Sequence, residues 1–146
     1  MEFRKINKHN YWECITLEVN ENQVEFIADN KQSLVEAAYE DNLYVLGIYQ
    51  DETMVGFLMY DYDDIALEWS LCRFMIGKQY QGKGYGKKAL KDFLVYLEKK
   101  YKIDKVYTEV SLDNVVACKL FVELGFVDVE KNEYTVLNQR YMVKEI

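Results

Sequence analysis

The chain has 146 residues, half of them hydrophobic, and a formal net charge of −7, which predicts one domain over residues 1–146 with a sizeable core. Three cysteines without a CxxC pair and a single histidine, His9, argue against a disulfide framework, a zinc site or a Cys–His nucleophile and fit a reducing cytoplasm. The charged N-terminus lacks a signal-peptide core, and no apolar run approaches the ~20 residues that a membrane span needs.

The N-terminal quarter predicts one strand and two helices. Residues 2–6 alternate apolar and charged side chains, as a strand does. An asparagine at position 7 or 10 can cap the next helix. We expect its apolar face to contain Trp12, Ile15, Leu17 and Val19. Ser33 stands three residues before Glu36, a capping box that predicts a short helix from Ser33 to about Tyr39.

The middle of the chain predicts three strands. Residues 43–49 and 54–60 are rich in β-forming side chains. The polar residues 50–53 between them predict a hairpin turn. Residues 61–64 predict an acidic loop, and the apolar residues 69–76 predict a buried strand.

The C-terminal part predicts two helices and three strands. Residues 84–101 carry apolar side chains at helical spacing on one face. These side chains are Ala89, Leu90, Phe93, Leu94 and Leu97. Residues 106–110 predict a strand, residues 114–124 a second helix, and residues 126–129 and 134–143 the closing strands. The order of elements indicates an α/β fold with a mixed central sheet.

A glycine-rich loop, residues 81–86, separates the buried strand from the long helix. Glycine adopts positive φ readily and lets a ligand approach the backbone closely. The first N–H groups of a helix have no partner within it, and the helix dipole adds positive charge there. A strand, a glycine loop and a helix N-terminus in this order predict a phosphate site.

Two known phosphate-binding patterns match this loop only in part. The stretch from Gly77 to Lys83 begins like the GxxxxGK of a P-loop, but the next residue is Gly84 instead of a Ser or Thr that binds Mg²⁺. Gly84, Gly86 and Ala89 match the GxGxxA of dinucleotide-binding folds. That fingerprint requires glycine directly after the strand, and two nucleotide-binding halves need a longer chain.

A third pattern covers more of the chain. Gln81-x-x-Gly84-x-Gly86 resembles motif A of the GNAT superfamily of N-acetyltransferases, whose loop binds the pyrophosphate of acetyl-CoA. A second block matches the family's N-x-x-A-x-x-L and G-F positions. Its residues are Asn114, Ala117, Leu120, Leu124, Gly125 and Phe126. The resemblance implies a mixed, mostly antiparallel central sheet, flanked by about four helices and splayed at the cofactor strand.

The chain is further similar to the bacterial spermine/spermidine (diamine) acetyltransferases. Four short segments carry this likeness: Glu21-Asn22-Gln23 with Phe26-Ile27, Arg73-Phe74-Met75-Ile76, Tyr80-Gln81-Gly82-Lys83-Gly84, and Met142-Val143-Lys144-Glu145. The implied acceptor is therefore a polyamine.

The resemblance implies a cofactor site with three parts. The backbone of Phe74, Met75 and Ile76 would pair with pantetheine, and an N–H near Met75 would hold the thioester oxygen. The alternative is that these three residues only pack their side chains in the core. Amides of the loop and helix start would bind the pyrophosphate, with Gln81 closing the turn. These residues are Gln81, Gly82, Lys83, Gly84, Tyr85, Gly86 and Lys87. Asn114 would hydrogen-bond CoA, cap its helix, or both.

The implied chemistry is attack of an amine on a thioester. An alkylammonium has a pKa near ~10.4, so a proton must leave first. Glu109 stands five residues before Asn114, where some relatives carry the base; a solvent-facing strand residue and a water chain are the alternatives. Phe121 occupies the cofactor-side position of a tyrosine that often protonates the leaving thiolate, which phenylalanine cannot do. Turnover could be slower, Tyr134 or Tyr141 could substitute, or the protein could bind CoA without transferring acetyl.

The charge distribution bears on the acceptor. Residues 78–105 hold nine lysines against three acidic residues, so the remaining chain is strongly acidic. Ten acidic residues flank the elements that usually line the acceptor cleft: Glu18, Glu21, Glu25, Glu36, Glu40, Asp41, Asp61, Asp63, Asp64 and Glu68. Such a field attracts a polycation.

We therefore expect acetyl transfer from acetyl-CoA, without a metal, to a primary amine of a small cationic acceptor. Spermidine and spermine are the first candidates. The alternatives are another small amine, a protein N-terminus, or a non-catalytic acyl-CoA-binding protein. A nucleic-acid or membrane partner is not expected, and the oligomeric state is open, with a homodimer as one option.

Overall fold

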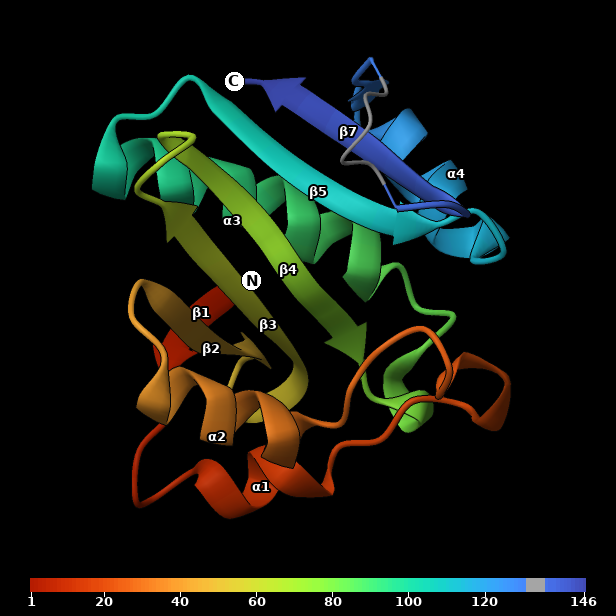
Figure 1. Cartoon of the computed structure of the whole chain (residues 1–146). Coiled ribbons are helices and arrows are strands. Elements are labelled where there is room, and N and C mark those ends of the chain that lie inside the picture. The colour runs from red at the N-terminus through yellow and green to blue at the C-terminus, as the bar shows by residue number, and fades with distance from the viewer. Residues whose placement is uncertain (131–135) are drawn as a thin grey trace.

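The structure, a computed structural model, describes residues 1–130 and 136–146. Its described strands form one sheet of seven in the order β1-β2-β3-β4-β5-β7-β6 (Figure 1). The strands are β1 (Glu2–Lys5), β2 (Leu43–Gln50), β3 (Thr53–Asp63), β4 (Glu68–Ile76), β5 (Lys105–Ser111), β6 (Val127–Asp128) and β7 (Gln139–Glu145). Only the pair of β4 and β5 is parallel among them. The expected mixed, mostly antiparallel sheet is confirmed.

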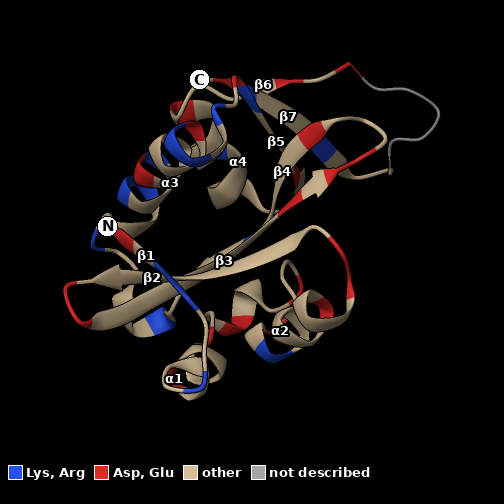
Figure 2. Cartoon of the chain, turned by 90° about the vertical axis from the view of Figure 1, so that its left-hand side faces the viewer, with Lys and Arg blue, Asp and Glu red and all other residues tan. Residues whose placement is uncertain are grey.

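Four α-helices among the described residues cover the two faces of this sheet. They are α1 (Tyr11–Thr16), α2 (Asn30–Tyr39), α3 (Tyr85–Tyr101) and α4 (Val115–Glu123), with short 3₁₀ helices η1 (Glu21–Gln23) and η2 (Lys78–Tyr80). Figure 2 shows α1 and α2 on one face and α3 and α4 on the other. None of the described helices is long and apolar enough to cross a bilayer.

The core has two parts because strand side chains alternate between the faces. On β3, Leu58 and Tyr60 belong to the cluster under α3 and α4, whereas Phe57 and Met59 belong to the cluster under α1 and α2. The predicted apolar face of the long helix is confirmed at four of its five positions by full burial and at Leu94 by partial burial. The fully buried side chains are Ala89, Leu90, Phe93 and Leu97.

Two helix predictions are wrong in detail. In the first helix region the expected burial of Leu17 is confirmed, but Trp12 is 66% exposed and the fully buried side chain is Cys14, which was not expected there. The second helix begins at Asn30, because Asp29 lies upstream and its Oδ1 accepts from Gln32 N (2.7 Å). A cap at Asp29 places Ser33 inside the helix, where it is buried and its Oγ donates to Asp29 O (3.2 Å).

The strand boundaries also differ from those that local patterns predict. β3 runs through the predicted acidic loop to Asp63, whose Oδ1 accepts from the N–H groups of Ile65 and Ala66 and so forms the turn. Cross-strand pairing with β4 continues over this acidic stretch and outweighs its low β propensity. The predicted closing strand at 134–143 lies partly outside the described residues, and β7 begins at Gln139.

Candidate active site

The site opens where β4 and β5 separate. The two strands pair only at Ser70 with Tyr107 and at Leu71 with Thr108, and Thr108 Oγ1 donates to Leu71 O (3.0 Å) at the last point of contact. Beyond it the strands diverge (Figure 1). A cleft of about 490 Å³ fills this gap and is lined from both faces of the sheet. The expected splay at the cofactor strand is confirmed.

A β-bulge in β4 shapes the wall of the cleft. Met59 of β3 lies opposite Arg73 and Tyr60 lies opposite Leu71, so Cys72 is an extra residue without a partner position. After the bulge, Arg73 and Met75 lie toward α1 and α2. Arg73 Nη1 donates to Ser33 Oγ (2.9 Å) and to Glu36 Oε2, and this hydrogen bond lowers the pKa of Glu36.

The backbone of β4 beyond the bulge offers unpaired groups to a ligand. Gly77 N donates to Val55 O (2.9 Å), and hydrogen bonding along an antiparallel pair alternates from residue to residue. This alternation directs the N–H of Met75 toward β3 and those of Phe74 and Ile76 toward the cleft. The carbonyl of Ile76 points the same way, because it accepts from the Gln81 side chain (2.9 Å). An N–H for a thioester oxygen is therefore better supplied by Phe74 or Ile76 than by Met75.

The glycine loop carries its own geometric requirement. Gly82 and Gly84 have φ of +78° and +79°, and a Cβ built on either would meet no atom within 4 Å. Glycine is needed here for the backbone conformation and not for packing. The first helical hydrogen bond of α3 runs from Lys88 N to Gly84 O (3.2 Å), so the N–H groups of residues 85–87 are not used within the helix. An anion can bind at these groups.

The cleft contains most of the residues that the sequence assigns to the site. Eleven of them line it: Phe74, Met75, Ile76, Gln81, Gly82, Gly84, Tyr85, Gly86, Glu109, Asn114 and Phe121. The side chains of Lys83 and Lys87 do not. Lys83 is exposed, and Lys87 Nζ lies 3.6 Å from Glu123 Oε2 on α4.

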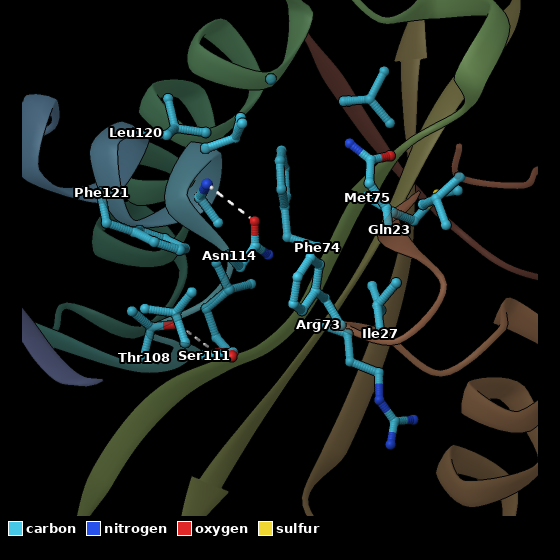
Figure 3. Close-up of a pocket in the computed structure, with 18 of the residues that line it drawn as sticks. Gln23, Ile27, Arg73, Phe74, Met75, Thr108, Ser111, Asn114, Leu120 and Phe121 are labelled. Carbon is cyan, nitrogen blue, oxygen red and sulfur yellow. Dashed lines mark hydrogen bonds between the residues drawn. The ribbon is translucent and has the colours of Figure 1, made fainter. Parts of the chain in front are cut away.

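The α4 wall carries Asn114 and Phe121 (Figure 3). Asn114 caps the helix, with Oδ1 accepting from Ala117 N (3.3 Å), and its Nδ2 has no partner among the described residues. The amide can therefore cap the helix and donate to a ligand at the same time. Phe121 is 6% exposed and packs edge-on against Phe126, with ring centroids 5.1 Å apart.

The charged side chains that line the cleft are mostly acidic. Among the residues that the structure describes, the only acidic ones that line the cleft are Glu25, after η1, and Glu109 on β5. The only basic one is Arg73, and its guanidinium pairs with Glu36. Of the ten acidic residues expected to flank the acceptor, only Glu25 lines the cleft. Glu18, for example, pairs with Lys78 instead (3.2 Å).

Of the two substitute proton donors, only Tyr141 belongs to the residues that the structure describes. Tyr141 sits on β7 opposite Glu109 in the strand register but does not line the cleft. Partial burial raises the pKa of Tyr141, and the neighbouring Glu109 carboxylate adds to that rise. Tyr134 lies outside the described residues.

Sequence reasoning missed several lining residues. Cys72, Thr108, Ser111 and Gln139 line the cleft without any motif to mark them. Thr108 could have been found, because it interrupts the buried side of β5 between Val106 and Val110. Gln139 could not, since only the pairing of β7 with β5 brings it to the site.

The sequence of the chain is similar to those of known acetyltransferases. Residues 7–126 match the model of the acetyltransferase (GNAT) family. The spermine/spermidine N(1)-acetyltransferase of Bacillus subtilis (strain 168) is 31% identical over 153 aligned positions, which cover 100% of this chain and 99% of that protein. A probable spermine N(1)-acetyltransferase of Bacillus subtilis subsp. natto (strain BEST195) matches at the same identity and coverage.

Two solved structures show the same fold. Spermidine N-acetyltransferase from Vibrio cholerae, in complex with CoA and spermine, superposes with a TM-score of 0.76 at 16% identity, over 99% of this chain and 94% of that one. PaiA N-acetyltransferase from Thermoplasma acidophilum, in complex with coenzyme A, superposes with a TM-score of 0.71 at 17% identity, over 99% and 98%. The chain is therefore an acetyl-CoA-dependent N-acetyltransferase and belongs to the acetyltransferase (GNAT) family.

Proposed function

We propose that the enzyme transfers the acetyl group of acetyl-CoA to a primary amine of a polyamine, with spermine and spermidine as acceptors. The observation that carries this proposal is the 31% identity, over the full length of both chains, to the Bacillus subtilis spermine/spermidine N(1)-acetyltransferase. The charge of the cleft supports it. Glu25 and Glu109 attract a polycation, while the guanidinium of Arg73 is neutralised by Glu36.

In this mechanism the acceptor amine attacks the thioester directly while both substrates are bound. An ammonium group first gives up a proton, to Glu109 or to a water next to it, because a protonated amine has no lone pair to attack with. The new bond joins the amine nitrogen to the acetyl carbon, and the bond from that carbon to sulfur breaks. The products are the acetamide, CoA thiol and one proton. The N–H groups of Phe74 or Ile76 stabilise the oxyanion that forms in between.

A thiol-release assay with acetyl-CoA and a panel of amines tests the proposal. We expect spermine and spermidine to have higher kcat/KM than butylamine, which carries one charge, and than a peptide with a free N-terminal alanine. A preference for butylamine or the peptide would replace the polyamine by another acceptor. No release with any amine, despite measurable CoA binding, would mean a CoA-binding protein without transfer.

Glu25 provides a sharper measure of the polycation preference. An exposed ion pair contributes about 0.2–1 kcal/mol, so Glu25→Gln, at an exposed position, should raise KM for spermine roughly 1.4–5-fold and leave KM for butylamine nearly unchanged. Added salt should reduce the difference between the parent and the variant. An equal effect on KM for both amines would show that Glu25 does not interact with the additional ammonium groups of spermine.

We further propose that the enzyme works in the cytoplasm. Its cysteines, Cys14, Cys72 and Cys118, are all free thiols, as a reducing compartment favours. Formation of a homodimer is a prediction that sedimentation of the purified chain can test.

A further inference from the structure

We propose that Gln23 is a positioning residue that couples the acceptor side of the cleft to the loop that would hold the cofactor's pyrophosphate. Only the identity of the two ligands rests on the proposed function. The contacts that join the two sides belong to the chain itself, and they link segments far apart in the sequence.

The two segments are joined by a pair of side-chain amides. Gln81 Nε2 donates to Gln23 Oε1 (2.9 Å), and Gln23 Nε2 donates back to Gln81 Oε1 (3.3 Å). We call this reciprocal pair the amide bridge. Asn20 Nδ2 also donates to Gln81 Oε1 (2.8 Å), and Asn20 N donates to Gln23 Oε1 (3.1 Å). The bridge is thus built on the capped first turn of η1.

The hydrogen-bonding capacity of Gln81 is fully used. A carboxamide has two N–H donors and can accept two hydrogen bonds at its oxygen. The donors of Gln81 serve Gln23 Oε1 and Ile76 O, and its oxygen accepts from Asn20 and Gln23. Its side chain can bind a phosphate only by giving up one of these bonds. Its function in the resting structure is therefore to hold the loop to β4 and to η1.

Each end of the bridge continues into a wall of the cleft. Residues 25–27 follow η1 and line the cleft on the side that we assign to the acceptor. Gly82, Gly84, Tyr85 and Gly86 follow Gln81 and line the side that we assign to the cofactor. A second tie runs parallel to the bridge, from Lys78 N to Glu18 O (2.7 Å). When two segments are fixed to each other, a ligand that orders one of them lowers the entropic cost of ordering the other. Acetyl-CoA bound in the loop should then favour acceptor binding, and the reverse.

Hydrogen exchange with CoA as the only ligand tests the coupling without an acceptor. In the parent protein we expect CoA to slow exchange both in the loop and at amides 18–28, the latter about fivefold or more. In Gln23→Ala the loop should still be protected, but amides 18–28 should change by less than about twofold. Asn22→Ala is the matched control, because this exposed neighbour in η1 has no side-chain partner among the described residues.

Steady-state kinetics with spermine provides a second readout. Gln23→Ala should raise KM for spermine about 5–10-fold, while kcat and the Kd of acetyl-CoA measured without spermine change less than about twofold. A merely structural defect would instead lower kcat and weaken both substrates. Gln23→Glu serves if the alanine variant unfolds η1. A carboxylate still accepts from Asn20 N and Gln81 Nε2 but sets an oxygen against Gln81 Oε1, so a smaller effect in the same direction is expected.

The outcomes separate this proposal from the proposed function. If the parent does not acetylate spermine but the exchange pattern differs between parent and Gln23→Ala as stated, the bridge stands and the acceptor assignment fails. If CoA protects amides 18–28 equally in the parent and in both Gln23 variants, the coupling proposal is overturned, whatever the acceptor.

Discussion

At the scale of single residues, Phe121 has the largest chemical consequence. It lines the cleft from α4 and packs on Phe126. The family resemblance predicts a tyrosine proton donor at this position, and phenylalanine has no proton to offer. The thiol of CoA has a pKa near ~8.5, so its thiolate can leave without being protonated first. Transfer can therefore proceed with water as the proton source, at a lower rate than a positioned acid allows.

Phe121→Tyr should increase kcat, because it adds a hydroxyl to a ring that already lines the cleft. We expect a gain of about 2–10-fold, below the ~10²–10⁴-fold typical of a positioned acid, since water already serves in part. The measurement is kcat for thiol release with saturating spermine and acetyl-CoA. An unchanged kcat with an unchanged melting temperature would mean that thiolate protonation does not limit turnover.

Glu109→Gln should lower kcat/KM by about 10²–10⁴-fold if the carboxylate accepts the ammonium proton. The substitution keeps the size of the side chain and removes its basicity. The deficit should shrink as the pH approaches ~10.4, because free amine then becomes abundant without a base. The pH profile of kcat/KM for spermidine is the measurement. Identical rates and profiles for parent and variant would leave a water chain as the base.

At the scale of elements, the loop between β4 and α3 combines two requirements. The positive φ of Gly84 ends the loop and starts α3, while Gly86 has an ordinary helical conformation. A Cβ at Gly86 would meet its neighbours at 3.8 Å or more, which is normal contact. The conformational requirement for glycine therefore applies to Gly84 and not to Gly86.

Gly84→Ala and Gly86→Ala should therefore act in opposite directions. A left-handed conformation costs an alanine about 1–2 kcal/mol, so Gly84→Ala should lower the free energy of unfolding by that amount and weaken CoA binding. Gly86→Ala should raise it by about 0.5–1 kcal/mol, because alanine loses less backbone entropy in a helix. Urea unfolding and CoA titration of both variants provide the comparison. Equal destabilisation by both would contradict a conformational origin.

At the scale of the whole molecule, the binding site lies where β4 and β5 no longer pair. β4 and β5 share two register pairs, and the lost strand contacts are replaced by a cleft lined from both faces. The same half of the sheet contains an unfavourable group. Asp61 Oδ1 is buried on β3 and has no hydrogen-bond partner among the described residues, and burial raises the pKa of Asp61.

Asp61→Asn should stabilise the protein at neutral pH. When folding raises the pKa of a carboxyl group, the folded state binds the proton more tightly than the unfolded state. The protein then loses stability as the pH rises through the raised pKa. After allowing for partial exposure, we expect a gain of about 1 kcal/mol, roughly 2–5 °C in Tm, that disappears in acid.

The matched control is Asp63→Asn, two residues further on. The N–H groups of Ala66 and Ile65 lower the pKa of Asp63, so its contribution is present at neutral pH and lost as the pH falls. This variant should lower Tm at pH 7 and have no effect in acid. A neutral-pH loss of Tm for Asp61→Asn would show that its carboxylate is well solvated or paired.

Local sequence determined much of this protein. Positive φ, helix starts and apolar periodicity are properties of a few neighbouring residues, so the glycine loop, the face of α3 and the Asn114 cap follow from the chain itself. The mostly antiparallel sheet and its splay follow from the family resemblance, whereas the order of the strands came from the structure.

Tertiary structure alone decided the rest, because it depends on contacts between distant residues. The bulge at Cys72 depends on the register with β3, which no pattern in β4 encodes. Arg73 pairs with Glu36, so Glu25 and Glu109 are the charged lining residues without an ion pair within residues 1–130 and 136–146, although composition offered ten acidic candidates. The amide bridge needs two carboxamides 58 positions apart to meet within hydrogen-bond distance, and only the packed fold brings them together.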